Sequence, residues 1–136
     1  MVSTLTLGSG SFTYEVAESW EKLPDGYWWR DAAAVVVDRQ DRVYVFNRGD
    51  HPMIVFDKDG NFLQSWGEGV FKNAHAVTLG PDDMLYCVDD GDHTVRKCTL
   101  KGEVLMTIGT PGQPSGHYSG DPFNRCTDLA LDPNTG

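Results

Sequence analysis

The strongest constraint on the fold is that one stretch of the sequence occurs twice. Residues 35–67 can be laid on residues 77–109 without a gap, a shift of 42 residues, and nine paired positions are identical. The identical pairs are Val35/Val77, Asp41/Asp83, Tyr44/Tyr86, Gly49/Gly91, Asp50/Asp92, His51/His93, Gly60/Gly102, Leu63/Leu105 and Gly67/Gly109. A period in the forties is typical of propeller blades. The sequence therefore predicts an all-β chain built from repeated blades.

Each copy contains four short apolar segments separated by turns, which fits one four-stranded blade. The segments of the first copy are residues 33–37, 43–46, 53–56 and 62–66, and those of the second are residues 76–79, 85–88, 94–98 and 104–108. We predict blades over residues 33–67 and 75–109. The unbroken apolar run at residues 33–37 predicts an innermost strand that is buried on both faces.

Incomplete units flank the two copies. Residues 11–20 alternate apolar and polar side chains at Phe12, Tyr14 and Val16, and we predict the outer strand of an incomplete blade there. Residues 127–136 resemble the start of the second copy and predict the first strand of a truncated blade. Residues 1–136 are thus expected to form a partial propeller of about two and a half blades, with possible self-association through the unpaired blade edge.

Composition narrows the classes of partner. The chain has 136 residues and a formal net charge of −9, which argues against nucleic acid and anionic membranes. No apolar run approaches the length of a membrane span, and the first ten residues lack the features of a signal peptide, so localisation stays open. Cys87, Cys98 and Cys126 have no metal-binding spacing, and we expect them to be small buried hydrophobes.

The histidines differ in how they relate to the repeat. His51 and His93 share one repeat position and are expected to fix a turn, whereas His117 has no partner residue in its loop. His75 breaks the repeat, because its counterpart in the first copy is Ala33. It begins an inner strand, and inner strands surround the channel of a propeller. One histidine makes a poor zinc site, but three from different blades would make a good one.

Arg48 is the second departure from the repeat, with Asp90 as its counterpart. Its guanidinium follows the second strand of the first copy and could hold a carboxylate through two hydrogen bonds. The alternative is a surface arginine paired with one of the many aspartates. The sequence leaves both interpretations open.

Four segments together resemble one family. They are Val-Tyr-Val-Phe-Asn-Arg-Gly-Asp-His at residues 43–51, Ala-His-Ala-Val at residues 74–77, Asp-Gly-Asp-His-Thr-Val-Arg-Lys at residues 90–97, and Pro-Phe-Asn-Arg-Cys-Thr-Asp at residues 122–128. The chain resembles, over most of its length from residue 33 onward, the NHL-repeat propellers related to the peptidyl-α-hydroxyglycine α-amidating lyase. The resemblance implies a six-bladed propeller when complete, with zinc in the channel and calcium nearby.

The resemblance also implies roles for particular residues. His75 matches a zinc ligand, although Ala74 and Ala76 replace the proline and glycine that flank that histidine in the family. Arg48 matches the residue that binds the substrate carboxylate. The backbone carbonyls of Val35 and Val77 match calcium ligands. The other zinc histidines and the catalytic tyrosine of the family would lie beyond Gly136.

The resemblance favours a fragment of a lyase-like protein, inactive as this chain, whose completed propeller cleaves peptidyl α-hydroxyglycine into a peptide amide and glyoxylate. Its expected cofactors are zinc and calcium, and its expected partner is a peptide or small-molecule carboxylate. Whether the chain belongs to an enzyme stays open, because a non-catalytic NHL-repeat propeller that binds a protein or ligand is an alternative. A sugar-lactone hydrolase is a weaker alternative, because the carboxylate-rich calcium motif of those enzymes is not seen in the sequence.

Overall fold

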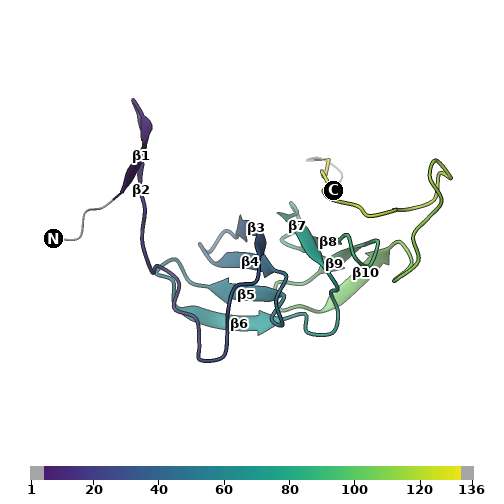
Figure 1. The fold of residues 1–136 in the computed structure, drawn as a ribbon, viewed down its shortest axis with the longest axis horizontal. Helices are drawn as coiled ribbons and strands as arrows, with labels where there is room; N and C mark the ends of the chain where they lie inside the picture. The colour runs from purple at the N-terminus through teal and green to yellow at the C-terminus, as the bar shows by residue number, and fades with distance from the viewer. Residues whose placement is uncertain (1–4, 133–136) are drawn as a thin grey trace.

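In the computed structural model, which describes residues 5–132, the chain folds into ten β-strands and no helix (Figure 1). The strands are β1 (Thr6–Ser9), β2 (Phe12–Glu15), β3 (Ala32–Val37), β4 (Val43–Asn47), β5 (Met53–Phe56), β6 (Phe62–Trp66), β7 (Ala74–Leu79), β8 (Leu85–Asp89), β9 (Thr94–Cys98) and β10 (Val104–Ile108). No helix capable of crossing a membrane occurs in this part of the chain.

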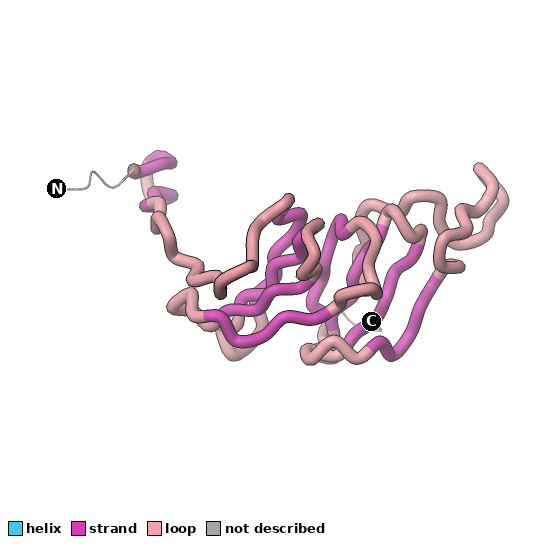
Figure 2. The backbone as a smooth tube through the Cα atoms, turned by 60° about the horizontal axis from the view of Figure 1, so that its bottom comes forward, coloured by secondary structure: helices cyan, strands magenta, loops and turns pink. Residues whose placement is uncertain are grey.

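Eight of these strands form two four-stranded antiparallel sheets, one for each copy of the repeat. The strands follow chain order in both sheets, β3-β4-β5-β6 and β7-β8-β9-β10. Figure 2 shows the two sheets as successive stacks of strands joined by loops. The predicted all-β class is therefore confirmed, and each predicted strand of the two copies is present with its bounds shifted by at most two residues.

The identical positions of the repeat include those at which the backbone turns sharply. Asp41 and Asp83 have φ angles of 58° and 57°, and Gly60 and Gly102 have φ angles of 77° and 90°. Tyr44 and Tyr86, which are also identical, each donate their hydroxyl to an aspartate of the turn that joins the first two strands of their sheet. The repeat in sequence is thus largely a repeat of turn geometry.

The main core lies between the two sheets. Tyr44, Phe46 and Met53 of the first sheet are fully buried and belong to one cluster with Leu85 and Cys87 of the second. Cys98 lies in the same cluster, so two of the three cysteines are buried as expected. The inner strands β3 and β7 lie against each other, as the inner strands of adjacent blades do.

The segment before β3 covers the opposite face of the first sheet. Trp20 and Trp29 pack on Phe56 with ring centroids 5.6 and 6.1 Å apart, and Tyr27 stacks on His51 at 3.7 Å. Trp28 remains 49% exposed. The aromatic side chains at positions 20, 27 and 29 therefore form an apolar cover on this face of the first sheet.

The first flanking unit differs from its prediction. Only residues 12–15 of the expected strand at 11–20 form β2, and they pair with β1, which the Ser/Thr/Gly-rich opening did not suggest. Within residues 5–132 this hairpin contacts no other strand (Figure 1). Ser19, with a φ angle of 56°, leaves the extended conformation before Trp20 turns onto Phe56.

The last unit and β3 also differ from their predictions. Residues 127–132 form no strand, and residues 133–136 lie outside the described part of the chain. The inner strand β3 is not buried on both faces: Val35 and Val37 are 61% and 49% exposed. Among the described residues only one face of β3 has a neighbouring sheet, which is β7–β10.

Two glycines with similar backbone conformations differ in their surroundings. Gly60 has a φ angle of 77°, and a Cβ there would overlap the carbonyl oxygen of Trp20, whereas Gly26 has a φ angle of 86° with nothing within 4 Å of a Cβ. We expect Gly26→Ala to lower the free energy of unfolding by about 1–2 kcal/mol through backbone strain alone. Gly60→Ala should lower it by at least ~2 kcal/mol more, because the segment at Trp20 must move. Urea unfolding of both variants checks this, and equal losses would contradict the packing role of Trp20.

Candidate functional site

Equivalent buried side chains at the ends of β4 and β8 hold the chain just before each inner strand. Asn47 Oδ1 accepts hydrogen bonds from the amides of residues 30 and 31, at 3.2 and 3.3 Å. Asp89 accepts from the amides of residues 72 and 73, at 2.6 and 3.0 Å. Asn47 is 1% exposed and Asp89 is 0% exposed. The backbone that leads into each inner strand is therefore held in place by the end of the neighbouring strand.

A β-bulge follows at the same position in both sheets. The register of β3 on β4 shifts between Ala32 and Ala34, and that of β7 on β8 shifts between Ala74 and Ala76. The residue inside the bulge is His75 in the second sheet, where it is half-buried. Bulges re-aim single side chains and are common beside active sites. The bulge belongs to the blade plan, and only the second blade fills it with a histidine.

Arg48 reaches from the first blade to the second. Its Nε donates to the carbonyl oxygen of Ala74 at 2.9 Å, and its amide donates to the carbonyl oxygen of Asp31 at 3.0 Å. Its Nη1 lies 4.0 Å from Asp31 Oδ2, and its side chain is 31% exposed. The structure thus places Arg48 against the residue that directly precedes His75. The two positions that break the repeat meet at one blade junction.

An equivalent junction links the second blade to the segment that follows it. Asp90, the counterpart of Arg48, accepts hydrogen bonds from Asn73 Nδ2 and, at 2.7 Å, from Arg125 Nη2. Burial alone would raise the pKa of Asp90, but the bonds from Arg125 and Asn73, with a contribution from the charge of His75, lower it below the ordinary value. Asp90 is therefore an ionised, buried carboxylate near His75. Sequence reasoning assigned no role to Asp90 or Arg125.

The carbonyl groups of Val35 and Val77 point away from the sheets. The amide of Asp38 donates to the carbonyl of Arg42, and the amide of Gly80 donates to that of Met84. Backbone groups alternate in direction along an antiparallel strand, and the register is regular from these bonds back to Val35 and Val77. Both carbonyls therefore face the open side of the inner strands, where an ion could be reached.

The described residues fit a metal only in part. Within residues 5–132 no three His, Cys, Asp or Glu side chains converge as a metal-binding group. His51 stacks on Tyr27 and lies 2.9 Å from Glu68 Oε1, while His93 Nδ1 accepts the amide of Arg125 at 3.0 Å. The two repeated histidines thus make different long-range contacts, and their expected role in fixing a turn stays a prediction. His75 supplies one imidazole, and a zinc site would need ligands from outside this part of the chain.

Among the described residues, a buried ionic cluster in the second blade has no equivalent in the first. Arg96 stands where the first copy has Ile54, and its guanidinium forms ion pairs with Asp92 and, at 3.8 Å, with Asp89. Lys72 Nζ lies 2.6 Å from the second oxygen of Asp92. Burial raises the pKa of Asp92, but the bonds from Lys72 and Arg96 outweigh it and the pKa falls below its ordinary value. The signal in the sequence was the charged residue at an apolar repeat position.

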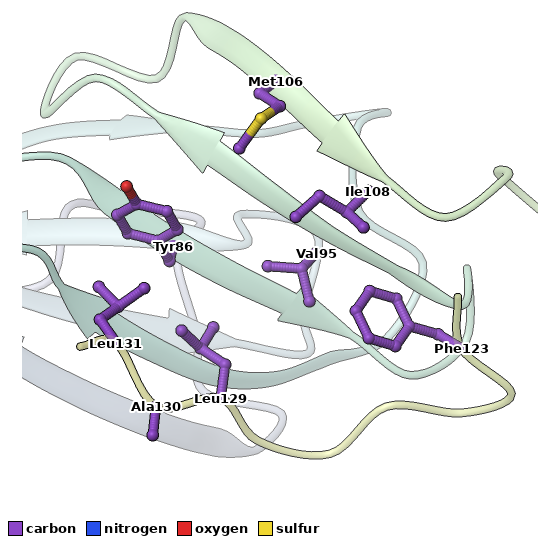
Figure 3. A pocket seen from close by; sticks show the side chains of 8 residues that line it. All are labelled: Tyr86, Val95, Met106, Ile108, Phe123, Leu129, Ala130 and Leu131. Atoms are coloured by element: carbon purple, nitrogen blue, oxygen red, sulfur yellow. The ribbon is translucent and has the colours of Figure 1, made fainter. Parts of the chain in front are cut away.

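An apolar cavity lies on the far face of the second sheet, away from the Arg48–His75 junction. Its volume is about 280 Å³. Figure 3 shows the side chains that line it, which are Tyr86, Val95, Met106, Ile108, Phe123, Leu129, Ala130 and Leu131. Tyr86 and Val95 are the repeat counterparts of Tyr44 and Met53, which pack against the second blade. This cavity therefore belongs to the face on which a next blade would pack.

Comparisons with known proteins find similarity to NHL repeat-containing proteins of two mammals. The chain is similar to human NHL repeat-containing protein 3, with 28% identity over 131 residues, covering 88% of this chain and 37% of the human protein. It is also similar to mouse NHL repeat-containing protein 3, with 30% identity over 98 residues, covering 66% of this chain and 28% of the mouse protein. No protein-family model matches the chain.

The chain thus spans about a third of the length of the curated relatives it matches. Together with the two four-stranded antiparallel sheets, these similarities support an NHL-repeat β-propeller module. The names of both relatives state the repeat and give no reaction or ligand.

The buried ionic cluster predicts a dependence of stability on pH. Because the pKa of Asp92 is lower in the folded protein than the ordinary value of 3.8, the unfolded chain binds more protons as the pH falls toward that value. The stabilisation by Asp92 is therefore complete above about pH 5 and is lost as the pH falls below about 4. Urea unfolding midpoints between pH 7 and pH 3 measure this loss.

Asp50 provides a matched control, because it occupies the same repeat position and is exposed. We expect Asp92→Asn to lower the free energy of unfolding at pH 7 by about 3 kcal/mol, since Arg96 loses its nearest partner, and to flatten the acid dependence. Asp50→Asn should change neither by more than ~0.5 kcal/mol. Equal effects of the two substitutions would refute the role of the cluster.

Proposed function

We propose that the propeller containing this chain binds a carboxylate-bearing ligand at the corner formed by Arg48 and His75, and that its reaction is the cleavage of a peptidyl α-hydroxyglycine. The observation that carries the proposal is the hydrogen bond from Arg48 Nε to the carbonyl of Ala74, directly before His75. Two residues that the blade plan does not require are thereby brought to one junction. The sequence resemblance assigns both of them to the same site.

Each residue has a distinct task in this proposal. Arg48 binds the carboxylate of the substrate through the part of its guanidinium that does not contact Ala74, and it orients the substrate beside His75. His75, re-aimed by the bulge, supplies one imidazole ligand for zinc. The chemistry that zinc would supply when bound is to lower the pKa of a hydroxyl group beside it.

The reaction balances without a further reagent. The hydroxyl of the α-hydroxyglycine loses its proton, and its oxygen becomes the carbonyl oxygen of glyoxylate. The bond between the α-carbon and the amide nitrogen breaks, and the nitrogen takes up a proton to leave the peptide amide. Arg48 keeps the carboxylate of the departing glyoxylate neutralised throughout.

Calcium is proposed as a structural ion. The carbonyl groups of Val35 and Val77 face the open side of β3 and β7, and these two inner strands lie against each other. Carbonyl oxygens are ligands that calcium accepts readily. The ion would join the first two blades at their inner strands.

A non-catalytic binding module is the second candidate. It is favoured by the engagement of Arg48, whose Nε already donates to the carbonyl oxygen of Ala74. In that case Arg48 serves as a tie between blades and as an anchor for a ligand carboxylate, and no bond of the ligand is broken. The two candidates share the binding corner and differ in metal content and product.

The first experiment is metal analysis together with an assay for glyoxylate release from an α-hydroxyglycine peptide, on the longest natural form of the protein. We expect stoichiometric zinc with release of glyoxylate. His75→Ala should lower the zinc content sharply while the thermal transition is kept, because His75 is only half-buried. His117→Ala is the control, since His117 is exposed in the loop of residues 110–121. An unchanged zinc content in His75→Ala would refute the assignment of His75 as a zinc ligand. Binding of the peptide without release of glyoxylate would favour the second candidate.

The role of Arg48 is tested separately. We expect Arg48→Met to weaken binding of a substrate or N-acylglycine probe by about tenfold or more, because a charged hydrogen-bonded pair is lost. Arg39→Met is the control, because Arg39 is 66% exposed and pairs with Asp83 in a turn at the other end of the inner strand. Titration calorimetry with the probe measures both. Equal affinities of Arg48→Met and the unmodified protein would contradict the carboxylate-binding role.

A further inference from the structure

Arg125 presents a guanidinium at the start of the third repeat. It lies two residues before Thr127, as Asn73 lies two residues before His75, so the second blade has an uncharged side chain at this position. Its Nη2 donates to Asp90 Oδ2 at 2.7 Å, and its side chain is 70% exposed while that of Asp90 is 4% exposed. One edge of the guanidinium is therefore bound to a buried carboxylate, and most of the group is open to solvent.

The surroundings of Arg125 hold it in place. Its amide donates to His93 Nδ1 at 3.0 Å. Two residues earlier, Phe123 points into the apolar cavity beside Val95 and Ile108 (Figure 3). Asp90 is held in turn by Asn73 Nδ2. Both the backbone of Arg125 and its ion-pair partner are thus anchored, so the guanidinium is preorganised for an exposed side chain.

Arg125 and Arg48 are both linked to the start of β7. Arg48 donates to the carbonyl of Ala74, and Asp90, the partner of Arg125, accepts from the side chain of the adjacent residue Asn73. Asn73 and Ala74 are consecutive residues, so both links end at the start of β7. His75 follows Ala74 directly. Two anchored cations are therefore linked to consecutive residues at the start of the inner strand β7.

We propose that Arg125, positioned by Asp90, forms a second carboxylate subsite beside the Arg48–His75 corner, so that the preferred ligand has an acidic side chain directly before its C-terminal glycine unit. This inference rests on the proposed binding of the terminal carboxylate by Arg48. An arginine fork matches a carboxylate in geometry as well as charge. The chain as a whole has a net charge of −9 and would repel such a ligand elsewhere.

A tie between the third repeat and the second blade is the structural alternative for Arg125. The two roles of Arg125 differ in their effect on the preference between ligands. A tie contributes to stability and acts equally on all ligands, whereas a subsite changes the preference between an acidic and a neutral ligand of the same shape. Because Arg125 is largely exposed, we expect a preference of about fivefold.

The test compares N-acetyl-Glu-Gly with N-acetyl-Gln-Gly, which differ in one charged group, by titration calorimetry on the longest natural form of the protein. We expect the Glu probe to bind about fivefold more tightly. Arg125→Gln should abolish this preference and leave the affinity for the Gln probe unchanged. Arg125→Lys should keep part of the preference, because the charge stays and the fork is lost. Arg39→Gln is the control and should keep the full preference.

The outcomes separate this inference from the proposed function. If both probes bind the unmodified protein equally, the subsite is refuted and binding at Arg48 stands. If neither probe binds, the proposed function fails and the subsite with it. If Arg125→Gln weakens both probes to the same extent or lowers the melting temperature without changing the preference, Arg125 is a structural tie and the subsite is refuted.

Discussion

The buried hydrogen bonds at Asn47 and Asp89 are the interaction on which the candidate site depends. Each side chain accepts hydrogen bonds from the amides of the two residues before an inner strand. The end of the second strand in each sheet therefore fixes the position at which the inner strand begins. Both side chains are shielded from water, and unpaired groups there would be costly. The bulge that contains His75 and the contact of Arg48 with Ala74 both lie directly beside these bonds.

The two blades share a backbone and differ in the side chains that it presents. At the bulge the first blade has Ala33 and the second has His75. The residue after the second strand is Arg48 in the first blade, and it donates a hydrogen bond to Ala74. In the second blade it is Asp90, which accepts a hydrogen bond from Arg125. A repeat therefore offers equivalent positions, and chemistry arises where one copy departs from the other at a position that the fold already holds.

The sequence predicted most of the fold because the repeat encodes turns, and turns determine where strands start and end. It identified Arg48 and His75 as departures from the repeat, and the structure shows that they share a junction. It missed β1, whose strand character comes only from pairing with β2, and it predicted a strand at residues 127–136, of which residues 127–132 form none. It also missed the role of Asp90 with Arg125, because the loop of residues 110–121 interrupts the repeat and separates the two in sequence.

The junctions between blades, rather than the blades themselves, are the units that carry chemistry in this arrangement. A single blade supplies either Arg48 or His75 but not both, and the same holds for Asp90 and Arg125, because each pair joins one repeat to the next. A binding corner therefore requires two successive repeats to be packed in register, which the Tyr44 and Leu85 side chains of the shared core ensure. Packing and function are coupled for that reason: whatever displaces one sheet against the other also separates the groups that would hold a ligand.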